Sequence, residues 1–424
     1  MAKNKKTVPS DDLKIMQADQ GIWNNSLDPL KNMASVDAFS RLRISQPYTI
    51  FDSQNRYRDS GKFSTSLTGT GSTAVHMPNE SAINLIVGIG ASSEVIRESK
   101  RVFPYQPGKS ILVMSSFVME TAKNNLRQRV GYFGSQNGIY FEQDGLKKYF
   151  VLRSYTSGTV QERRIEQFQW NGHKFDGSEF NLRNLDVTKG NIFWADIEWL
   201  GVGDVRCGFV IDGEPIVAHT FHNENLYSTT YMTTATLPLR YEITNTAATG
   251  STSTLKQICS TVISEGGYEG TSNVSMVTTP IVTGNMIDLG SPGTRTPIIS
   301  IRLKSANLDA CVLPIQLDLM CTSNDLIHFE LVANGTFPGN PVFTSYSSNS
   351  SVESAIGGTS ITGGTLLQGG FIYQKDSISL GGTDNFDFQL GRTLAGVSDV
   401  VTLVATSNGT NSKVAGGIGW FELI

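Results

Sequence analysis

The chain has 424 residues and a formal net charge of −4, and only 17% of its residues are charged. The negative balance excludes nucleic acid as the main partner of the whole chain, and the 21 phenylalanines exclude a disordered chain, because such a sequence can bury a core. No run approaches the roughly 18 apolar residues of a membrane span, and the start carries no apolar leader, so we expect no membrane partner and no secretion.

Residues 1–46 are predicted to form an extended N-terminal arm that has no core of its own. Lys3, Lys5 and Lys6 make its start basic, so this segment could contact phosphate or an acidic neighbour. A solvated terminus is the simpler interpretation. Arms of this kind often reach over a neighbouring subunit, so we place the three lysines among the candidate assembly residues.

Residues 47–268 are predicted to form a first antiparallel β-sandwich, because apolar and polar residues alternate with period two. The clearest alternation runs from Ile192 to Trp199, and a second one ends at the tight-turn signal Asp212-Gly213, so these strands and the next form a meander. The side chains expected to face the core of the first two strands are Phe193, Ala195, Ile197, Trp199, Val205, Cys207, Phe209 and Ile211. Earlier strands are expected at Ser110–Val118, Arg129–Phe133, Gly138–Phe141 and Tyr149–Ser154.

Residues 269–297 are poor in large apolar side chains and rich in glycine and proline, and we interpret them as a linker. Alternation returns in residues 298–424, which are predicted to form a second sandwich, with a long exposed Ser/Gly/Thr-rich loop over residues 345–366 and a strand at Phe386–Leu390. The fold class is therefore all-β: two antiparallel β-sandwich, jelly-roll-like domains with an extended N-terminal arm.

Metal and nucleophile signals are weak. The four cysteines lie far apart without CxxC spacing and are expected to be free, mostly buried thiols. His219 and His222 are the two closest histidines, but a separation of three places them on opposite faces of a strand. They could share an ion only if the chain leaves the strand at Phe221. We therefore expect no metal and no other cofactor.

A carboxylate pair and an aromatic residue are the remaining chemical candidates. Asp196 and Glu198 share the polar face of their strand, with Cβ atoms roughly 7 Å apart, and glycosidases hold their two carboxyls about 5–10 Å apart. Trp194 is expected beside them, where an exposed indole would serve as a sugar platform or a subunit anchor. Alternation on a solvated strand gives the same carboxylate spacing and is the favoured explanation of it, and packing under a loop is the favoured interpretation of Trp194.

Several stretches resemble a family of virion structural proteins from marine and environmental tailed phages, over roughly residues 33–335. The stretches that carry the resemblance are Ala34–Ser53, Tyr105–Ser110, Arg129–Phe133, Asp196–Gly213, Leu237–Ile243, Ile258–Gly267 and Ile299–Ser305. The meander that ends in Phe209-Val-Ile-Asp-Gly is also similar to concanavalin-like or laminin-G-like jelly rolls. Members of that fold class include sugar-binding and purely structural proteins, so the fold alone leaves the ligand open.

The resemblance implies a non-enzymatic structural protein of a virion, made in the host cytoplasm. It would act by self-association, as a homo-oligomer of three or more copies, and by docking on other virion proteins of the head, as decoration or fibre, or of the tail and baseplate. The alternatives are a host-attachment module that binds a surface glycan and, behind it, a glycan depolymerase that uses Asp196 and Glu198. In the family signature, Arg41 and Arg43 face the same way and are flanked by Asp37 and Asp52. Bidentate pairs between these guanidinium and carboxylate groups could hold the arm on its own or a neighbouring subunit, or they could be ordinary ion pairs within the domain.

Overall fold

The computed structural model describes residues 46–178, 184–267, 273–281, 286–373, 376–381 and 388–423. The chain divides into two units at Pro47, and almost all of the first unit lies outside the described residues. The arm predicted over residues 1–46 therefore stays a prediction. Its candidate assembly residues outside the described ranges are Lys3, Lys5, Lys6, Asp37, Arg41 and Arg43.

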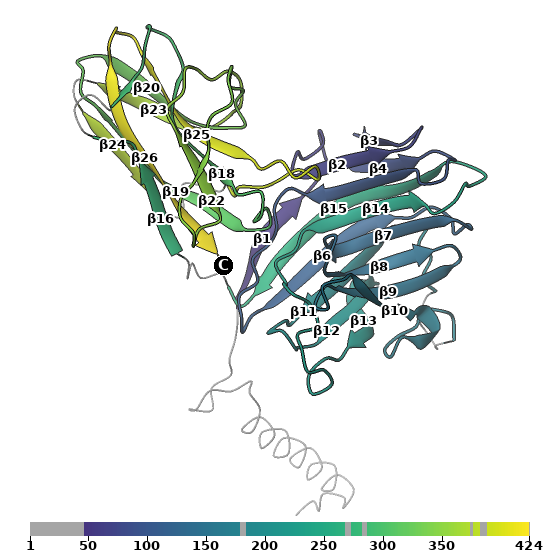
Figure 1. Ribbon diagram of the computed structural model, residues 1–424. Helices are drawn as coiled ribbons and strands as arrows, with labels where there is room; N and C mark the ends of the chain where they lie inside the picture. Colours follow the sequence, from purple (N-terminus) through teal and green to yellow (C-terminus); the bar gives the residue numbers. More distant parts are fainter. Residues whose placement is uncertain are drawn as a thin grey trace, which may run out of the picture. The chain divides into compact units, whose positions relative to one another are not determined.

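The described residues form an all-β structure of antiparallel strands in four sheets, with a single 3₁₀ turn, η1 (Gln167–Gln169) (Figure 1). The first sheet has the order β13 (Glu214–Phe221), β12 (Val205–Ile211), β11 (Asn191–Ile197), β6 (Ser110–Val118), β15 (Ser253–Glu265), β4 (Ala82–Val87) and β3 (Thr73–Met77), with β1 (Pro47–Ser53) also paired to β15. The second sheet has the order β10 (Gln161–Glu166), β9 (Lys147–Ser154), β8 (Gly138–Asp144), β7 (Leu126–Phe133), β14 (Leu239–Asn245), β5 (Glu94–Ser99) and β2 (Phe63–Thr68). These two sheets make the first sandwich.

The other two sheets make the second sandwich. One has the order β16 (Asn273–Thr278), β26 (Lys413–Leu423), β19 (Cys311–Cys321) and β24 (Ser377–Gly381), with β17 (Ile287–Asp288) also on β26. The other has the order β21 (Thr344–Ser345), β22 (Val352–Ile356), β18 (Thr296–Leu303), β25 (Val400–Ser407), β20 (Leu326–Ala333) and β23 (Thr365–Tyr373). Within the described ranges, no helix is long and apolar enough to cross a membrane.

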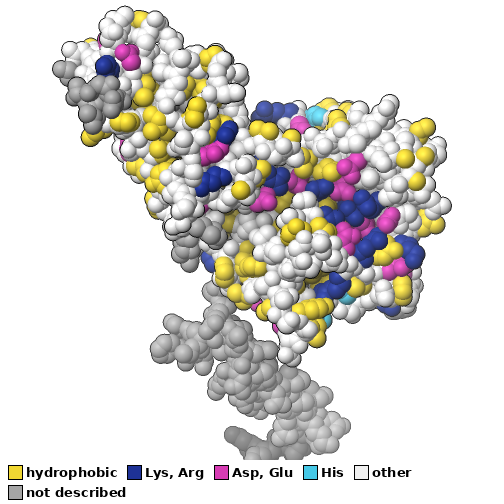
Figure 2. Space-filling view, viewed as in Figure 1, with side chains coloured by type: hydrophobic (Ala, Val, Ile, Leu, Met, Phe, Trp, Pro, Cys, Tyr) yellow, Lys and Arg dark blue, Asp and Glu magenta, His cyan; other side chains and the backbone are white. Residues whose placement is uncertain are grey.

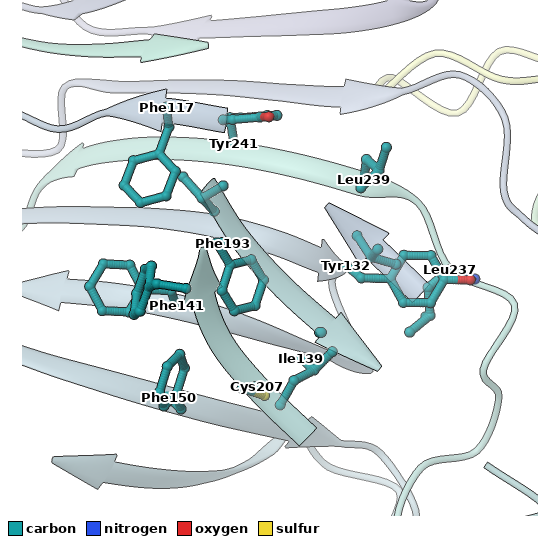
Figure 3. Packing of buried hydrophobic residues seen from close by; sticks show 14 of the residues in the cluster. Phe117, Tyr132, Ile139, Phe141, Phe150, Phe193, Cys207, Leu237, Leu239 and Tyr241 are labelled. Atoms are coloured by element: carbon teal, nitrogen blue, oxygen red, sulfur yellow. The ribbon is translucent and has the colours of Figure 1, made fainter. Parts of the chain in front are cut away.

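The core of the first sandwich is formed by alternate residues of its two sheets, as the period-two pattern predicts (Figure 3). Phe193 of β11 and Phe209 of β12 come from one sheet, and Phe141 of β8 and Phe150 of β9 from the other. The Phe209 ring lies 5.1 Å from that of Phe141 and 5.8 Å from that of Phe150, at centroid-to-centroid distances typical of favourable aromatic pairs. The two sheets are thus joined by ring contacts across the middle layer.

The predicted meander is present as the neighbouring strands β11, β12 and β13. Asp212 and Gly213, between β12 and β13, have φ values of 52° and 88°. Positive φ at both central residues is the requirement of a two-residue hairpin turn whose twist matches the strands, and glycine meets it without a steric penalty. This turn brings the start of β12 beside the end of β13, so that Val205 pairs with Phe221.

Three local predictions differ from the structure. Strand β16 lies inside the predicted linker, where it pairs with β26 and buries Val277. Strand β22 lies inside the stretch predicted to be a long loop and pairs with β18. Both strands are built largely from small or polar residues, so neither shows a strong apolar alternation. Phe388–Leu390 is not a strand, and the rest of the strand predicted at Phe386–Leu390 is outside the described residues.

Candidate functional site

The residues proposed as a glycan platform do not form an exposed group. Trp194 is only 5% exposed and Asp196 only 7%, whereas Glu198 is exposed. Strand β11 is flanked on both sides, by β6 and β12, and Trp194 lies over Gly208 of β12, where a Cβ atom would come within 3.0 Å of the indole. Asp196 forms an ion pair with Arg206, its direct cross-strand partner. The alternatives of an exposed Trp194 and of a free Asp196 carboxylate are therefore contradicted.

Asp52 is the one predicted assembly residue within the described ranges. It is exposed on β1 and forms an ion pair of 3.1 Å with Lys62. The predicted pairing of Asp52 with Arg41 and Arg43 involves residues outside those ranges and stays a prediction.

The outer face of the seven-stranded sheet carries a dense array of ion pairs. Figure 2 shows dark blue and magenta side chains gathered over the part of the first sandwich where Figure 1 places β7 to β10. Arg129 of β7 bonds to Glu142 of β8 at 2.6 Å and to Glu242 of β14 at 3.1 Å. Further along, Arg153 bonds to Glu162 at 2.8 Å. We call this set, with Glu98, Arg164 and Arg240, the ion-pair face.

Strand register explains the ion-pair face. Arg129 lies directly opposite both Glu142 and Glu242, and Arg153 lies directly opposite Glu162. Cross-strand neighbours on one face have Cβ atoms about 5 Å apart, so opposite charges at these positions meet without strain. The sheet thereby satisfies each of these carboxylates with a guanidinium group.

The ion-pair face lowers the pKa of two of its carboxylates, Glu242 and Glu162. Burial alone would raise the pKa of Glu242, but the charges of Arg240, Arg129 and Arg127 outweigh it and leave the pKa below its usual value. The pKa of Glu162 is lowered in the same way, against burial, by hydrogen bonds from Arg153 and Tyr140. A glycosidase acid needs the opposite shift, a carboxyl whose pKa is raised so that it keeps its proton near neutral pH.

A second feature is a cavity of about 170 Å³ at the rim of the first sandwich, between the edge strand β10 and the loop after β13. We call it the rim pocket. It is lined by Leu152, Ser154, Thr156, Gln161, Arg163, Asn223, Tyr227, Thr229, Thr230 and Tyr231. The accessible wall is therefore mainly apolar carbon, which includes two tyrosine rings, and hydroxyl, amide and guanidinium groups are set into it. This mixture is typical of sites that bind a polyhydroxylated ligand.

Arg163 is the most constrained polar residue of the rim pocket. Its Nη1 donates to the Tyr227 hydroxyl at 2.7 Å and its Nη2 to Oδ1 of Asn223 at 3.0 Å. The guanidinium carbon also lies 4.8 Å from the ring centre of Phe221 and 5.6 Å from that of Tyr227. Asn223 is itself fixed, because its Nδ2 donates to the Gly203 and Phe221 carbonyls. The guanidinium is therefore held in one place.

Tyr231 also lines this pocket, and its hydroxyl group is buried. Its side chain is buried, and its hydroxyl has no hydrogen-bond partner among the described residues. Burial raises the pKa of this hydroxyl, so it stays protonated. A buried hydroxyl without a partner costs free energy, roughly 1–3 kcal/mol, and that cost is recovered if a ligand or water reaches it.

Metal-ligating groups meet beside the rim pocket at Asp204, His222 and Glu224, whose donor atoms lie within 4.8 Å of one another. Asp204 precedes β12 and His222 follows β13, and the direct pairing of Val205 with Phe221 brings them together. His222 Nδ1 lies 2.9 Å from Asp204 Oδ2. Burial and a hydrogen bond to Glu224 raise the pKa of Asp204, and the neighbouring His222 acts in the opposite direction. Two carboxyls and an imidazole have the chemistry of a divalent-cation ligand set.

The two histidines considered from the sequence do not form a shared set. Strand β13 ends at Phe221, so His222 lies beyond it, as the alternative required, but His222 meets Asp204 instead of His219. His219 is buried, and its Nδ1 accepts a hydrogen bond from the Asn171 backbone at 3.3 Å.

Comparisons with known proteins give structural likenesses only. No protein-family model and no curated protein matches the chain. Among solved structures, the carbohydrate-binding module CBM2 of the evolved Dit protein of Lactobacillus casei BL23 phage J-1 is 6% identical, with a TM-score of 0.35, over 54% of this chain and 100% of that one. A GH16 protein of the Bacteroides ovatus mixed-linkage glucan locus is 9% identical, with a TM-score of 0.33, over 50% and 99%. A β-1,3-glucanase of Mycobacterium marinum is 9% identical, with a TM-score of 0.32, over 51% and 98%. These values are too low to carry a functional conclusion.

Proposed function

We propose that this chain is a non-enzymatic structural protein of a tailed-phage virion, on the head or in the tail, and that its first sandwich binds a glycan of the host surface. The observation that carries the glycan part is the rim pocket, in which a fixed guanidinium, a tyrosine and several hydroxyl-bearing residues converge. The virion part is supported by the resemblance of the stretches from Ala34–Ser53 to Ile299–Ser305 to phage structural proteins.

Binding without hydrolysis is the better match to Asp196 and to the carboxylates of the ion-pair face. Asp196, one of the two residues considered for depolymerase chemistry, is buried and paired with Arg206. On the ion-pair face, Glu142 and Glu242 both bond to Arg129, and the pKa of Glu242 is lowered. Neither place offers the pair of one protonated and one free carboxyl that retaining and inverting glycosidases use.

A glycan array probed with the full chain tests the proposal. We expect selective binding, and Tyr227→Ala should weaken it about tenfold or more, because this change removes a ring and a hydroxyl from the pocket wall. Tyr57→Ala is the matched control, since Tyr57 is highly exposed and does not line the rim pocket. Absence of binding by the folded protein would contradict the proposal, as would release of reducing sugar that survives Tyr227→Ala.

Self-association is favoured by the edge of the second sandwich. Strand β23 pairs only with β20 among the described strands, and its Leu366, Phe371 and Tyr373 are 57%, 67% and 56% exposed. Exposed apolar side chains on an unpaired sheet edge are typical of a surface that another chain covers. We expect an oligomer of three or more copies in size-exclusion chromatography with light scattering, and Phe371→Ser with Tyr373→Ser should shift it toward monomer. A wild-type protein that runs as a 46.1 kDa monomer at micromolar concentration would refute self-association.

A further inference from the structure

Arg163 differs from the other arginines of its strand region in having no carboxylate partner among the described residues. Arg164, next to it on β10, pairs with Glu142 and Asp144, and Arg153 on the neighbouring strand pairs with Glu162. Arg163 donates hydrogen bonds to the neutral oxygens of Tyr227 and Asn223, and no lining residue of the rim pocket is acidic. The pocket therefore contains a positive charge that its own wall does not neutralise.

The free hydrogen-bonding capacity of Arg163 and Tyr227 includes several donors. A guanidinium carries five N–H groups, and the two bonds to Tyr227 and Asn223 use one hydrogen on each Nη, which leaves a second hydrogen on each. The Nε of Arg163 is buried and has no partner among the described residues. Because the Tyr227 oxygen accepts from Arg163, its own O–H is left to donate outward.

The charge of Arg163 is also felt by its surroundings. His219, buried nearby, has its pKa lowered to about 4, first by burial and then by the charge of Arg163. The pocket is thus small and holds one positive charge with free donors in a largely apolar wall, which is complementary to a carboxylate on a sugar ring.

We infer that the rim pocket binds the carboxylate of an acidic sugar, such as a uronic or sialic acid, with Arg163 and Tyr227 as the anion-binding residues. A guanidinium matches a planar carboxylate in geometry as well as in charge. The cavity of about 170 Å³ is smaller than the roughly 300–1,000 Å³ pockets that enclose drug-sized ligands, so a single sugar residue enters it. This inference rests on the proposed glycan-binding function and specifies its ligand class.

Isothermal titration of the full chain tests the inference with galacturonate oligosaccharides, N-acetylneuraminate and the methyl esters of both. The acids should bind, with an affinity that falls as salt is added, and the esters should bind at least tenfold more weakly. Arg163→Gln should weaken acid binding ten- to hundredfold, the effect of losing a hydrogen-bonded charge pair. Arg163→Lys should restore part of it, because it keeps the charge but loses the planar donor pair. The control is Arg58→Gln, which removes the same charge from an exposed position that does not line the pocket.

The outcomes separate this inference from the proposed function. Equal binding of acids and esters, or acid binding that is unchanged in a folded Arg163→Gln protein, overturns the acidic-sugar inference. A neutral glycan that binds equally well to wild type and to Arg163→Gln also overturns it, while glycan binding itself stands. Absence of binding to every acidic and neutral glycan removes both.

Discussion

Replacing Glu242 by glutamine should destabilise the first sandwich by about 3–5 kcal/mol at pH 7, the usual cost of removing one partner from a buried ion pair. The Glu242 side chain is only 4% exposed and accepts hydrogen bonds from Arg129 and Arg240. Glutamine keeps the shape but leaves those guanidinium groups without their counter-charge. The folded-state pKa of Glu242 lies below its usual value of 4.5. The stabilisation is therefore fully present above about pH 4.5 and is lost as the pH falls through the lowered pKa.

Urea unfolding followed by tryptophan fluorescence measures this loss. Urea is uncharged and does not screen ion pairs, and Trp170, Trp194 and Trp199 report on the first sandwich. With a slope of about 2–3 kcal/mol per molar, the midpoint should fall by roughly 1–2 M. Asp52→Asn is the control: its pair with Lys62 is 66% exposed on the aspartate side, so it should cost at most about 1 kcal/mol. A midpoint for Glu242→Gln that moves no further than this control, or a difference that does not shrink as the pH falls below 4.5, would refute the reasoning.

Two further predictions concern other buried groups. Because the pKa of His219 is lowered to about 4, the protein should lose roughly 2–3 kcal/mol of stability as the pH falls from about 6.5 to 4, where only the unfolded state takes up the proton. Urea unfolding at a series of pH values measures this fall in the free energy of unfolding, which His219→Gln should lack. A fall that is unchanged in His219→Gln would assign it to another group. A maleimide reagent at pH 8 should label Cys259, which is exposed, whereas Cys207, Cys311 and Cys321 are buried and should react only in denaturant; native labelling that survives Cys259→Ser would show that a buried thiol is accessible.

The strands with strong alternation could be predicted from the sequence. Ser110–Val118 coincides with β6, and the meander of β11 to β13 follows from its apolar period and the Asp212-Gly213 turn. Strands such as β16 and β22 could not, because alternation detects a strand only where its buried face is large and apolar. The small side chains of β22 are covered by neighbouring strands and contribute little to the pattern.

The candidate site was harder to predict, because alternation assigns a residue to a face and says nothing of what covers that face. Trp194 is on the predicted face, but Gly208 on the adjacent strand leaves room for its ring to lie flat and become buried. The alternating charges of Arg127-Gln-Arg129 and Arg240-Tyr-Glu242 did carry a signal for the ion-pair face. The rim pocket had no such signal, because the loop after β13 shows no periodic pattern of apolar residues. In addition, its Tyr227 and Arg163 of β10 are 64 residues apart in the sequence.

Strand β10 offers an internal comparison that bears on whether Arg163 has a function. Glu162 and Arg164 point to one face of the sheet, where both are paired with opposite charges, whereas Arg163 points to the other. An uncharged donor at position 163 would satisfy the same acceptors, because Asn223 and Tyr227 are both neutral. Holding a guanidinium there without a carboxylate costs stability. A cost of this kind is understandable at a place where a ligand completes the pairing, and for that reason Arg163→Gln should stabilise the unliganded fold while it removes acid binding.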